Sequence, residues 1–209
     1  MSVAEERRHF PRFDVLSQSK FWDEVTGGVV RRRLQPPGPL QFFDADEAAV
    51  AEALFDRLLA REDGPEVDVL GVVDGRLAGG AGDGYRYEDM PEDAEAWKRS
   101  LAALDADCNA IYGVGFAKAD HQDQIRILEL VRASKDQWHG LPAARLFSLW
   151  MRYACAAFYA HPLVWNEIGF GGPAYPRGYK NIGIDRREPW EVAEADASDP
   201  VPLTGGEGR

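Results

Sequence analysis

Residues 142–160, PAARLFSLWMRYACAAFYA, form the stretch that decides the expected fold. Apolar side chains cover almost every side of a helix built from this stretch, and helices of that kind are buried. Proline suits its first position, and the His161-Pro162 pair suits its end. The length approaches that of a membrane span, but Arg145 and Arg152 would be costly in lipid. The sequence therefore predicts the central helix of a protein core.

A first helix is expected earlier in the chain. Asp44 or Asp46 can cap its start, because a carboxylate there accepts hydrogen bonds from the free N–H groups of the first turn. Apolar residues then recur every fourth position as one stripe: Val50, Leu54 and Leu58. The loop-forming residues at 63–65 mark its expected end.

Three more helices are expected before residue 142. The segment 67–77 predicts a short helix, with a strand as the alternative because its first half is rich in β-branched residues. A flexible loop is expected at 79–84. Pro91 is placed in the first turn of the third helix and Asp120 at the start of the fourth. The apolar stripes of these two helices contain Trp97, Leu101, Leu104, Cys108 and Ile111, and Ile125, Leu128 and Val131.

These segments predict an all-α fold, a compact bundle of five to six helices with a long C-terminal loop rich in Gly, Pro and aromatic residues. We expect an N-terminal arm at 1–39, with a short helix at 19–33 and a proline cluster at its end. The helical domain is expected at 40–184. The acidic tail at 185–209 contains few apolar residues, and we expect it to be disordered.

The chain of 209 residues carries a formal net charge of -11. Nucleic acids and anionic membranes both attract concentrated Lys and Arg, so this balance argues against either partner. The one dense basic run, Arg31-Arg32-Arg33, is expected to be a solvated helix end. We therefore expect neither a nucleic-acid partner nor direct membrane insertion.

The sequence lacks the residue spacings that mark common cofactor sites. The segment 80–84, Gly-Ala-Gly-Asp-Gly, does not have the G-x-G-x-x-G spacing and is interpreted as a linker. No G-x-S-x-G motif is present. Cys108 and Cys155 lie outside any Cys-x-x-Cys, and whether they pair stays open. The four histidines are scattered along the chain: His9, His121, His139 and His161. We therefore expect no metal and no c-type haem. The missing nucleotide-binding spacing predicts that this chain does not bind flavin by itself, and we expect no catalytic residue in it.

The most distinctive segment is FYAHPLVWNEIGFGGPAYPRGY at 158–179. Glycines permit close backbone approach and prolines reduce the entropy lost on ordering, so we expect an ordered loop without regular secondary structure. Tyr175 and Tyr179 offer rigid rings suited to interfaces. His161 is expected to act as a hydrogen-bonding cap beside the motif, and Asn166-Glu167 to satisfy loop backbone groups. Two alternatives stay open, in which the loop packs on its own bundle or contacts a partner.

This segment resembles the C-terminal signature of the gluconate 2-dehydrogenase subunit 3 family, in which an aromatic helix end precedes a Gly-Gly/Pro/Tyr/Pro/Gly/Tyr loop. Residues 43–59 resemble the opening helix of the family, and residues 100–105, SLAALD, resemble its middle helix. The resemblance covers residues 40–183, and the late loop is its specific part.

The resemblance implies a non-catalytic small subunit that binds, stabilises or matures a larger FAD-dependent dehydrogenase of the glucose-methanol-choline (GMC) type, acting on sugars or sugar acids. FAD is then expected in the partner, with no cofactor in this chain, and many such complexes also contain a cytochrome c subunit. The expected partner interface consists of Phe158, His161, Trp165, Asn166, Glu167, Phe170, Gly171, Gly172, Pro173, Tyr175, Pro176 and Tyr179.

Family members often carry a twin-arginine export signal, and Arg7-Arg8 looks superficially like the start of one. An export signal then needs an apolar stretch, but Pro11 and charged residues follow instead. We therefore expect no export signal and a cytoplasmic location, with transfer to the periplasm on a partner's signal as the alternative.

Two other functions stay open from the sequence. One is a free-standing hydrolase or oxidoreductase with a pocket at the Trp165–Tyr179 loop, which titratable groups converging on one cavity would favour. The other is an export escort that leaves the flavoprotein after delivery.

Overall fold

The computed structural model describes residues 10, 13–60, 65–80, 82, 84, 86–181, 183, 186, 188 and 190–191. This described part is all-α, as the sequence predicts, apart from one pair of two-residue strands. The chain divides into two compact units. We call Gln35–Ala160 the bundle unit, and we call the described residues up to Leu34 together with those from His161 onward the terminal unit.

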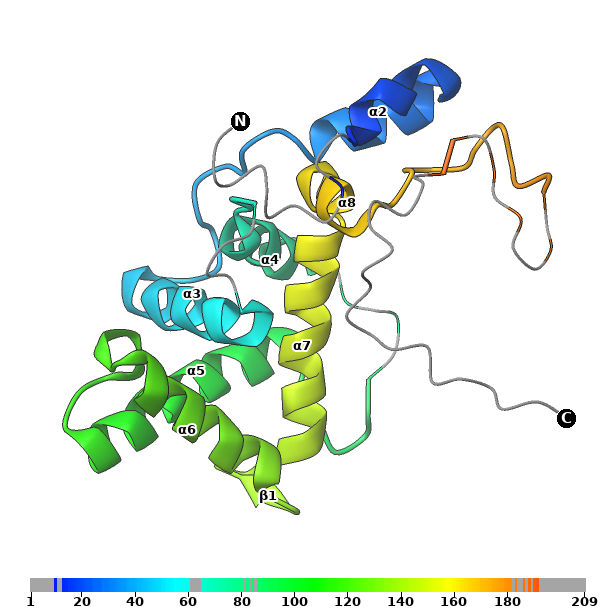
Figure 1. The fold of residues 1–209 in the computed structure, drawn as a ribbon. Coiled ribbons are helices and arrows are strands. Elements are labelled where there is room, and N and C mark those ends of the chain that lie inside the picture. Colours follow the sequence, from blue (N-terminus) through cyan, green and yellow to red (C-terminus); the bar gives the residue numbers. More distant parts are fainter. Residues whose placement is uncertain are drawn as a thin grey trace, which may run out of the picture. The chain divides into compact units, whose positions relative to one another are not determined.

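The bundle unit is built around a central helix, α7 (Ala143–Tyr159), as the sequence predicts. Figure 1 shows this helix in yellow, and it packs against each of the four preceding helices. In chain order, the other elements of the unit are α3 (Ala45–Leu59), α4 (Val69–Ala78), α5 (Asp93–Tyr112), η2 (Phe116–Lys118), α6 (His121–Ala133), β1 (Gln137–Trp138) and β2 (Leu141–Pro142).

Buried aromatic rings join α3, α5 and α7. The Trp97 ring lies 5.6 Å from that of Phe55 and 5.7 Å from that of Tyr153, measured between centroids. The indole N–H of Trp150 donates to Ser100 Oγ at 3.0 Å, and Ser100 Oγ donates to the carbonyl of Trp97 at 2.9 Å. Because the Trp150 N–H has a partner, this large ring is buried without losing a hydrogen bond.

The burial of α7 is one-sided, whereas the sequence predicts a helix buried on almost all sides. Trp150 and Tyr153 are buried, but the Tyr159 side chain is 48% exposed. Arg145 and Arg152 are only half-buried, and Arg145 pairs with Asp89. The apolar composition overstates the burial because one face of α7 is not covered by the bundle unit. No helix among the described residues is long and apolar enough to cross a membrane.

Carboxylate caps set the starts of three helices in the bundle unit. Asp44 and Glu47 form a reciprocal capping box at α3. Asp120 caps α6 as the sequence predicts, by accepting a hydrogen bond from the backbone of Asp123. Asp68 accepts a hydrogen bond from Gly71 N at 2.7 Å and so starts α4. The predicted helix at 67–77 is therefore confirmed over its strand alternative.

Three predicted details of α5 and α6 are wrong. Pro91 lies before α5 instead of in its first turn, because Glu92 is the N-cap. Ile111 is 54% exposed, since it lies in the last turn before the C-cap at Gly113. On α6 the deeply buried isoleucine is Ile127, at 1% exposure, while Ile125 is half-buried.

Asp74 on α4 holds the chain segment that leads into α3. Its carboxylate accepts hydrogen bonds from the backbone N–H groups of Gln41, Phe42 and Phe43 at 2.7, 2.9 and 2.9 Å. The side chain is 2% exposed. A buried carboxylate is tolerated only when such bonds replace its hydration, so these contacts fix the approach to α3. The sequence alone does not single out Asp74.

A short hairpin, which the sequence does not predict, precedes α7. Its strands pair antiparallel around His139 and Gly140, which have φ values of 49° and 73°. Positive φ at both positions is typical of a two-residue hairpin turn. Asp107 of α5 accepts a hydrogen bond from Trp138 Nε1 at 2.8 Å, and its other oxygen lies 2.7 Å from His139 Nε2. The hairpin is thereby tied to α5.

The terminal unit joins the two ends of the described chain and contains η1 (Val15–Phe21), α2 (Glu24–Arg32) and α8 (Pro162–Ile168). The single helix expected at 19–33 is divided in two, because Asp23 caps a new helix after the first ends. The sequence groups the segment 161–184 with the helical domain at 40–184. In the structure, the described residues of this segment instead belong to the same compact unit as the arm.

Candidate interaction surface

The first part of the distinctive segment is a helix, and the prediction of an irregular loop from residue 161 is wrong there. His161 Nδ1 accepts a hydrogen bond from Leu163 N at 3.3 Å, which confirms its predicted role as a cap. Pro162 occupies the first turn, and Gly169 ends α8 in the left-handed conformation at φ 67°. Seven residues are too few to show a helical period in the sequence. The irregular loop begins only at Gly169.

The aromatic centre of this segment packs against the N-terminal arm. Trp165 is 4% exposed and forms a core with Val15, Trp22 and Val30. Asn166 Oδ1 accepts a hydrogen bond from Val15 N at 2.8 Å. Asn166 therefore satisfies a backbone group, as predicted, but that group belongs to the arm and not to the loop.

Two glycines of the loop allow very close packing. A Cβ at Gly172 would lie 2.7 Å from Trp22 Cζ2, and one at Gly171 would lie 2.8 Å from Trp190 Cε3. Gly172 also has a φ of 77°, which favours glycine. Trp190 and the 5%-exposed Glu188 come from the stretch expected to be disordered, and they contact the loop instead. The rest of that expectation, at 185, 187, 189 and 192–209, lies outside the described residues.

The twelve residues of the expected interface differ widely in exposure. Four are buried: Phe158, Trp165, Gly171 and Gly172. Four are half-buried: His161, Asn166, Glu167 and Pro173. Four are exposed: Phe170, Tyr175, Pro176 and Tyr179. Phe158 belongs to α7 of the bundle unit, and the other buried three shape the terminal unit from within. The exposed four present the largest share of their surface to solvent.

Exposed apolar side chains are concentrated in the terminal unit. Among the described residues, it holds eight of the fifteen exposed large hydrophobic side chains but only 49 of the 168 residues. Such concentrations mark interaction sites in many proteins. Sequence reasoning missed five of the eight, although three of them recur every fourth residue along the arm. We call the eight the apolar set: Phe21, Val25, Val29, Leu163, Ile168, Phe170, Tyr175 and Tyr179.

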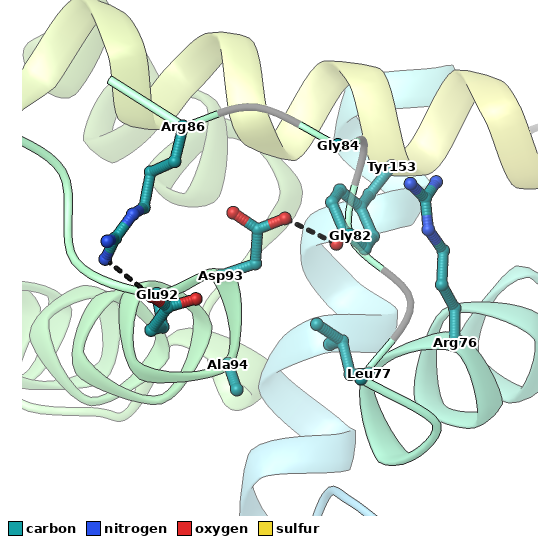
Figure 2. Close-up of a pocket in the computed structure, with 10 residues that line it drawn as sticks. Arg76, Leu77, Gly82, Gly84, Arg86, Glu92, Asp93, Ala94 and Tyr153 are labelled. Atoms are coloured by element: carbon teal, nitrogen blue, oxygen red, sulfur yellow. Dashed lines mark hydrogen bonds and ion pairs between the residues drawn. The ribbon is translucent and has the colours of Figure 1, made fainter. Parts of the chain in front are cut away.

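A separate pocket of about 630 Å³ lies in the bundle unit, where α4, α5 and α7 meet Gly80, Gly82 and Gly84. Figure 2 shows Glu92 paired with Arg86 and Asp93 paired with Tyr153, while Arg76 lies over the Tyr153 ring. Arg86 pairs with Glu92 at 2.8 Å, and the Tyr153 hydroxyl donates to Asp93 Oδ2 at 2.7 Å. The described lining residues include no Ser, Cys or His, so they offer no pair of nucleophile and imidazole base. Three glycines of the segment expected to be a linker thus line a pocket. The pocket arises from helix packing, which the local sequence does not reveal.

The described residues contain no group of three or more His, Cys, Asp or Glu that could hold a metal ion. Cys108 and Cys155 are not paired with each other. Burial raises the pKa of both thiols, so each stays protonated and is a weak nucleophile at neutral pH.

A family model for gluconate 2-dehydrogenase subunit 3 matches residues 45–172, which is more than half of the chain. This chain belongs to the gluconate 2-dehydrogenase subunit 3 family. Comparison with curated proteins and with solved structures gave no match.

The match to the gluconate 2-dehydrogenase subunit 3 family includes parts of both units. It begins at the start of α3 and ends at Gly172, so it includes every helix of the bundle unit as well as α8. The arm that covers α8, with Val15 and Trp22, lies outside the match. Tyr175 and Tyr179 also lie outside it. The family helix α8 is therefore packed by residues that the family model does not include.

His161 gives the terminal unit of this family member a pH dependence. Burial lowers the pKa of its imidazole, so the unfolded chain binds the proton more readily than the folded one. The contribution of His161 to stability is therefore complete above its ordinary pKa of about 6.5 and declines as the pH falls below it. His161→Asn keeps a capping acceptor without the titration. We expect the wild type to lose stability relative to this variant between pH 8 and pH 5 in denaturant unfolding, and a constant difference would contradict the prediction.

Proposed function

We propose that this chain is the non-catalytic small subunit that binds, stabilises or matures a larger FAD-dependent dehydrogenase of the GMC type acting on sugars or sugar acids. Membership of the gluconate 2-dehydrogenase subunit 3 family supports the role of a subunit in such a complex. FAD is carried by the partner in this proposal, and a cytochrome c subunit can complete the complex.

The observation that carries the proposal is the concentration of exposed apolar side chains in the terminal unit. Phe170, Tyr175 and Tyr179 are 39%, 65% and 52% exposed. Large aromatic rings contribute much of the binding energy at protein interfaces, because they bury a large area and lose little conformational entropy. They are held by a loop whose inner residues are buried. A prearranged surface of this kind costs little free energy to order on binding.

The packing also bears on the alternative of a free-standing enzyme with its pocket in the Trp165–Tyr179 loop. The inner side of that loop is filled by its own unit, because Val15 and Trp22 contact Gly172 and Trp190 contacts Gly171. This arrangement favours a docking element over a substrate cavity at the centre of the loop.

The proposal is tested by native pull-down of the tagged full chain from the cell that encodes it. We expect a larger yellow protein with flavin absorption to co-purify in a constant ratio and to oxidise a sugar or sugar acid, while the chain alone is colourless. Pulse labelling distinguishes the export escort, for which association would be transient. Isolation of the chain with turnover of its own, or without any flavoprotein, would contradict the proposal.

We expect the triple variant Phe170→Ala, Tyr175→Ala, Tyr179→Ala to bind the flavoprotein about 100-fold more weakly. Each exposed aromatic residue at an interface contributes on the order of 1 kcal/mol or more, and three together give roughly two powers of ten. The affinity is measured by titration of the purified flavoprotein. The matched control, Tyr87→Ala, Ile111→Ala, Leu130→Ala, removes side chains of similar exposure from the bundle unit and is expected to bind as the wild type does. Equal weakening by both triples would exclude a specific role for the loop.

A further inference from the structure

Arg177 in the loop of the terminal unit carries a charge that no carboxylate of the described residues neutralises. Its guanidinium donates hydrogen bonds to Gln18 Oε1 and to the carbonyl of Gly171, both at 3.1 Å and both neutral. Its Nε is buried without a hydrogen-bond partner. Burial lowers the pKa of Arg177, because a guanidinium is costly to remove from water without an anion beside it.

Aromatic rings hold this guanidinium in place. Its central carbon lies 3.9 Å from the centroid of the Trp190 ring and 5.4 Å from that of the Phe21 ring. Contact with ring faces stabilises the cation and leaves the N–H groups at its edge to form hydrogen bonds. The site is therefore rigid and cationic before any ligand arrives.

A cavity of about 520 Å³ beside Arg177 collects further positive charge. Lys20 and Lys180, both exposed, contribute to its lining together with Phe21 and Trp190. The one acidic side chain among the described lining residues is Glu188, whose carboxylate already accepts hydrogen bonds from the backbone N–H groups of residues 180 and 181. Among the described lining residues, three cations thus face one carboxylate that is already engaged.

We infer that this cavity binds an Asp or Glu side chain from an acidic segment of the partner protein. A carboxylate matches the fork of N–H groups on Arg177 and is attracted by both lysines. Phe21 and Tyr179, 46% and 52% exposed, offer apolar contacts to the residues on either side of that carboxylate. A small free anion would leave these rings uncovered. The inference rests on the proposed function only in taking the acidic segment from a partner protein.

The test uses the isotope-labelled full chain and nuclear magnetic resonance. The probe is the capped peptide Glu-Tyr-Asp-Glu-Phe-Glu, and its counterpart with Gln and Asn at the acidic positions controls for charge. We expect the acidic peptide to shift the Arg177 Nε–H signal in a saturable manner and to bind less tightly as salt rises. The amide peptide is expected to leave the signal in place. Equal shifts by the two peptides, or no shift by either, would overturn the inference.

Substitutions then locate the binding. The double variant Lys20→Gln, Lys180→Gln is expected to bind the acidic peptide about 5-fold more weakly, since two partly screened charge contacts are lost. Lys118→Gln, Lys135→Gln removes the same charge from exposed positions of the bundle unit and is expected to bind as the wild type does. Equal weakening by both pairs would overturn the inference in favour of non-specific attraction.

Two further measurements identify what occupies the cavity. Inorganic phosphate that displaced the peptide at equal concentration would assign the cavity to a small anion and overturn the inference. A chain ending at Glu191 that bound the peptide at least 10-fold more tightly would assign the cavity to the acidic residues of the chain's own C-terminal segment, which would also overturn the inference.

The inference and the proposed function can fail separately. If the flavoprotein co-purifies but the Lys20, Lys180 variant binds it normally, the inference fails and the proposed function stands. If the acidic peptide binds here but no flavoprotein co-purifies, the proposed function fails instead.

Discussion

Replacing Asp74 by alanine is expected to lower the free energy of unfolding of the protein by about 3–5 kcal/mol. The carboxylate accepts three backbone hydrogen bonds from residues 41–43, and the Phe43 bond is fully buried. Alanine leaves all three N–H groups without this partner, and each orphaned buried donor costs about 1–3 kcal/mol. The effect is measured by urea unfolding followed by circular dichroism at 222 nm.

Two companion variants separate the hydrogen bonds from other effects of the substitution. Asp74→Asn keeps the shape and one acceptor oxygen, so we expect roughly half of the loss. Asp68→Ala removes a carboxylate from the exposed N-cap of the same helix and is expected to cost about 1 kcal/mol. If Asp74→Ala were no more harmful than Asp68→Ala, the buried carboxylate would not be holding the segment before α3.

Replacing Gly172 by alanine is expected to destabilise the terminal unit by about 2–4 kcal/mol. The left-handed backbone at φ 77° costs an L-residue about 1–2 kcal/mol. The new methyl group would also overlap Trp22 and Val15, and overpacking of this kind costs about 1–3 kcal/mol. We expect weaker near-ultraviolet circular dichroism from the tryptophans of this unit and faster proteolysis after residue 160.

Gly178→Ala is the matched control for Gly172→Ala. Gly178 has a similar φ of 68°, but nothing lies within 4 Å of the position of an added Cβ. This variant therefore isolates the backbone term and is expected to cost about 1–2 kcal/mol. Equal losses in the two variants would show that the contact between the loop and the arm contributes nothing to stability.

Local signals were sufficient to predict most of the bundle unit. Asp44 and Asp120 lie where a carboxylate can accept hydrogen bonds from a first turn, and each starts a helix as predicted. The stripes of α3 and α5 repeat at the helical period over several turns, so the buried face could be read directly. Errors arose at helix ends, as at Pro91 and Ile111, where one or two residues decide whether a side chain still faces the core.

The candidate surface was predicted only in part. Tyr175 and Tyr179 were identified because rigid rings among glycines and prolines are typical of interfaces. Trp165, Gly171 and Gly172 belong to the same segment but are buried. Which residues of an irregular loop point outward depends on what covers its other side. Periodicity cannot show this, because the covering residues lie elsewhere in the chain, in the distant arm and at Trp190.

The sequence by itself determined the helices of the bundle unit and the family, since caps and apolar periodicity act within short stretches of chain. Only the tertiary structure decided that the segment after His161 packs with the arm, through the Asn166–Val15 hydrogen bond and the contacts of Trp165. It also decided that, among the residues the structure describes, Arg177 forms its hydrogen bonds with neutral groups only. The physical reason is that burial and charge compensation depend on contacts between residues about 150 positions apart, and local preferences carry no information about such contacts.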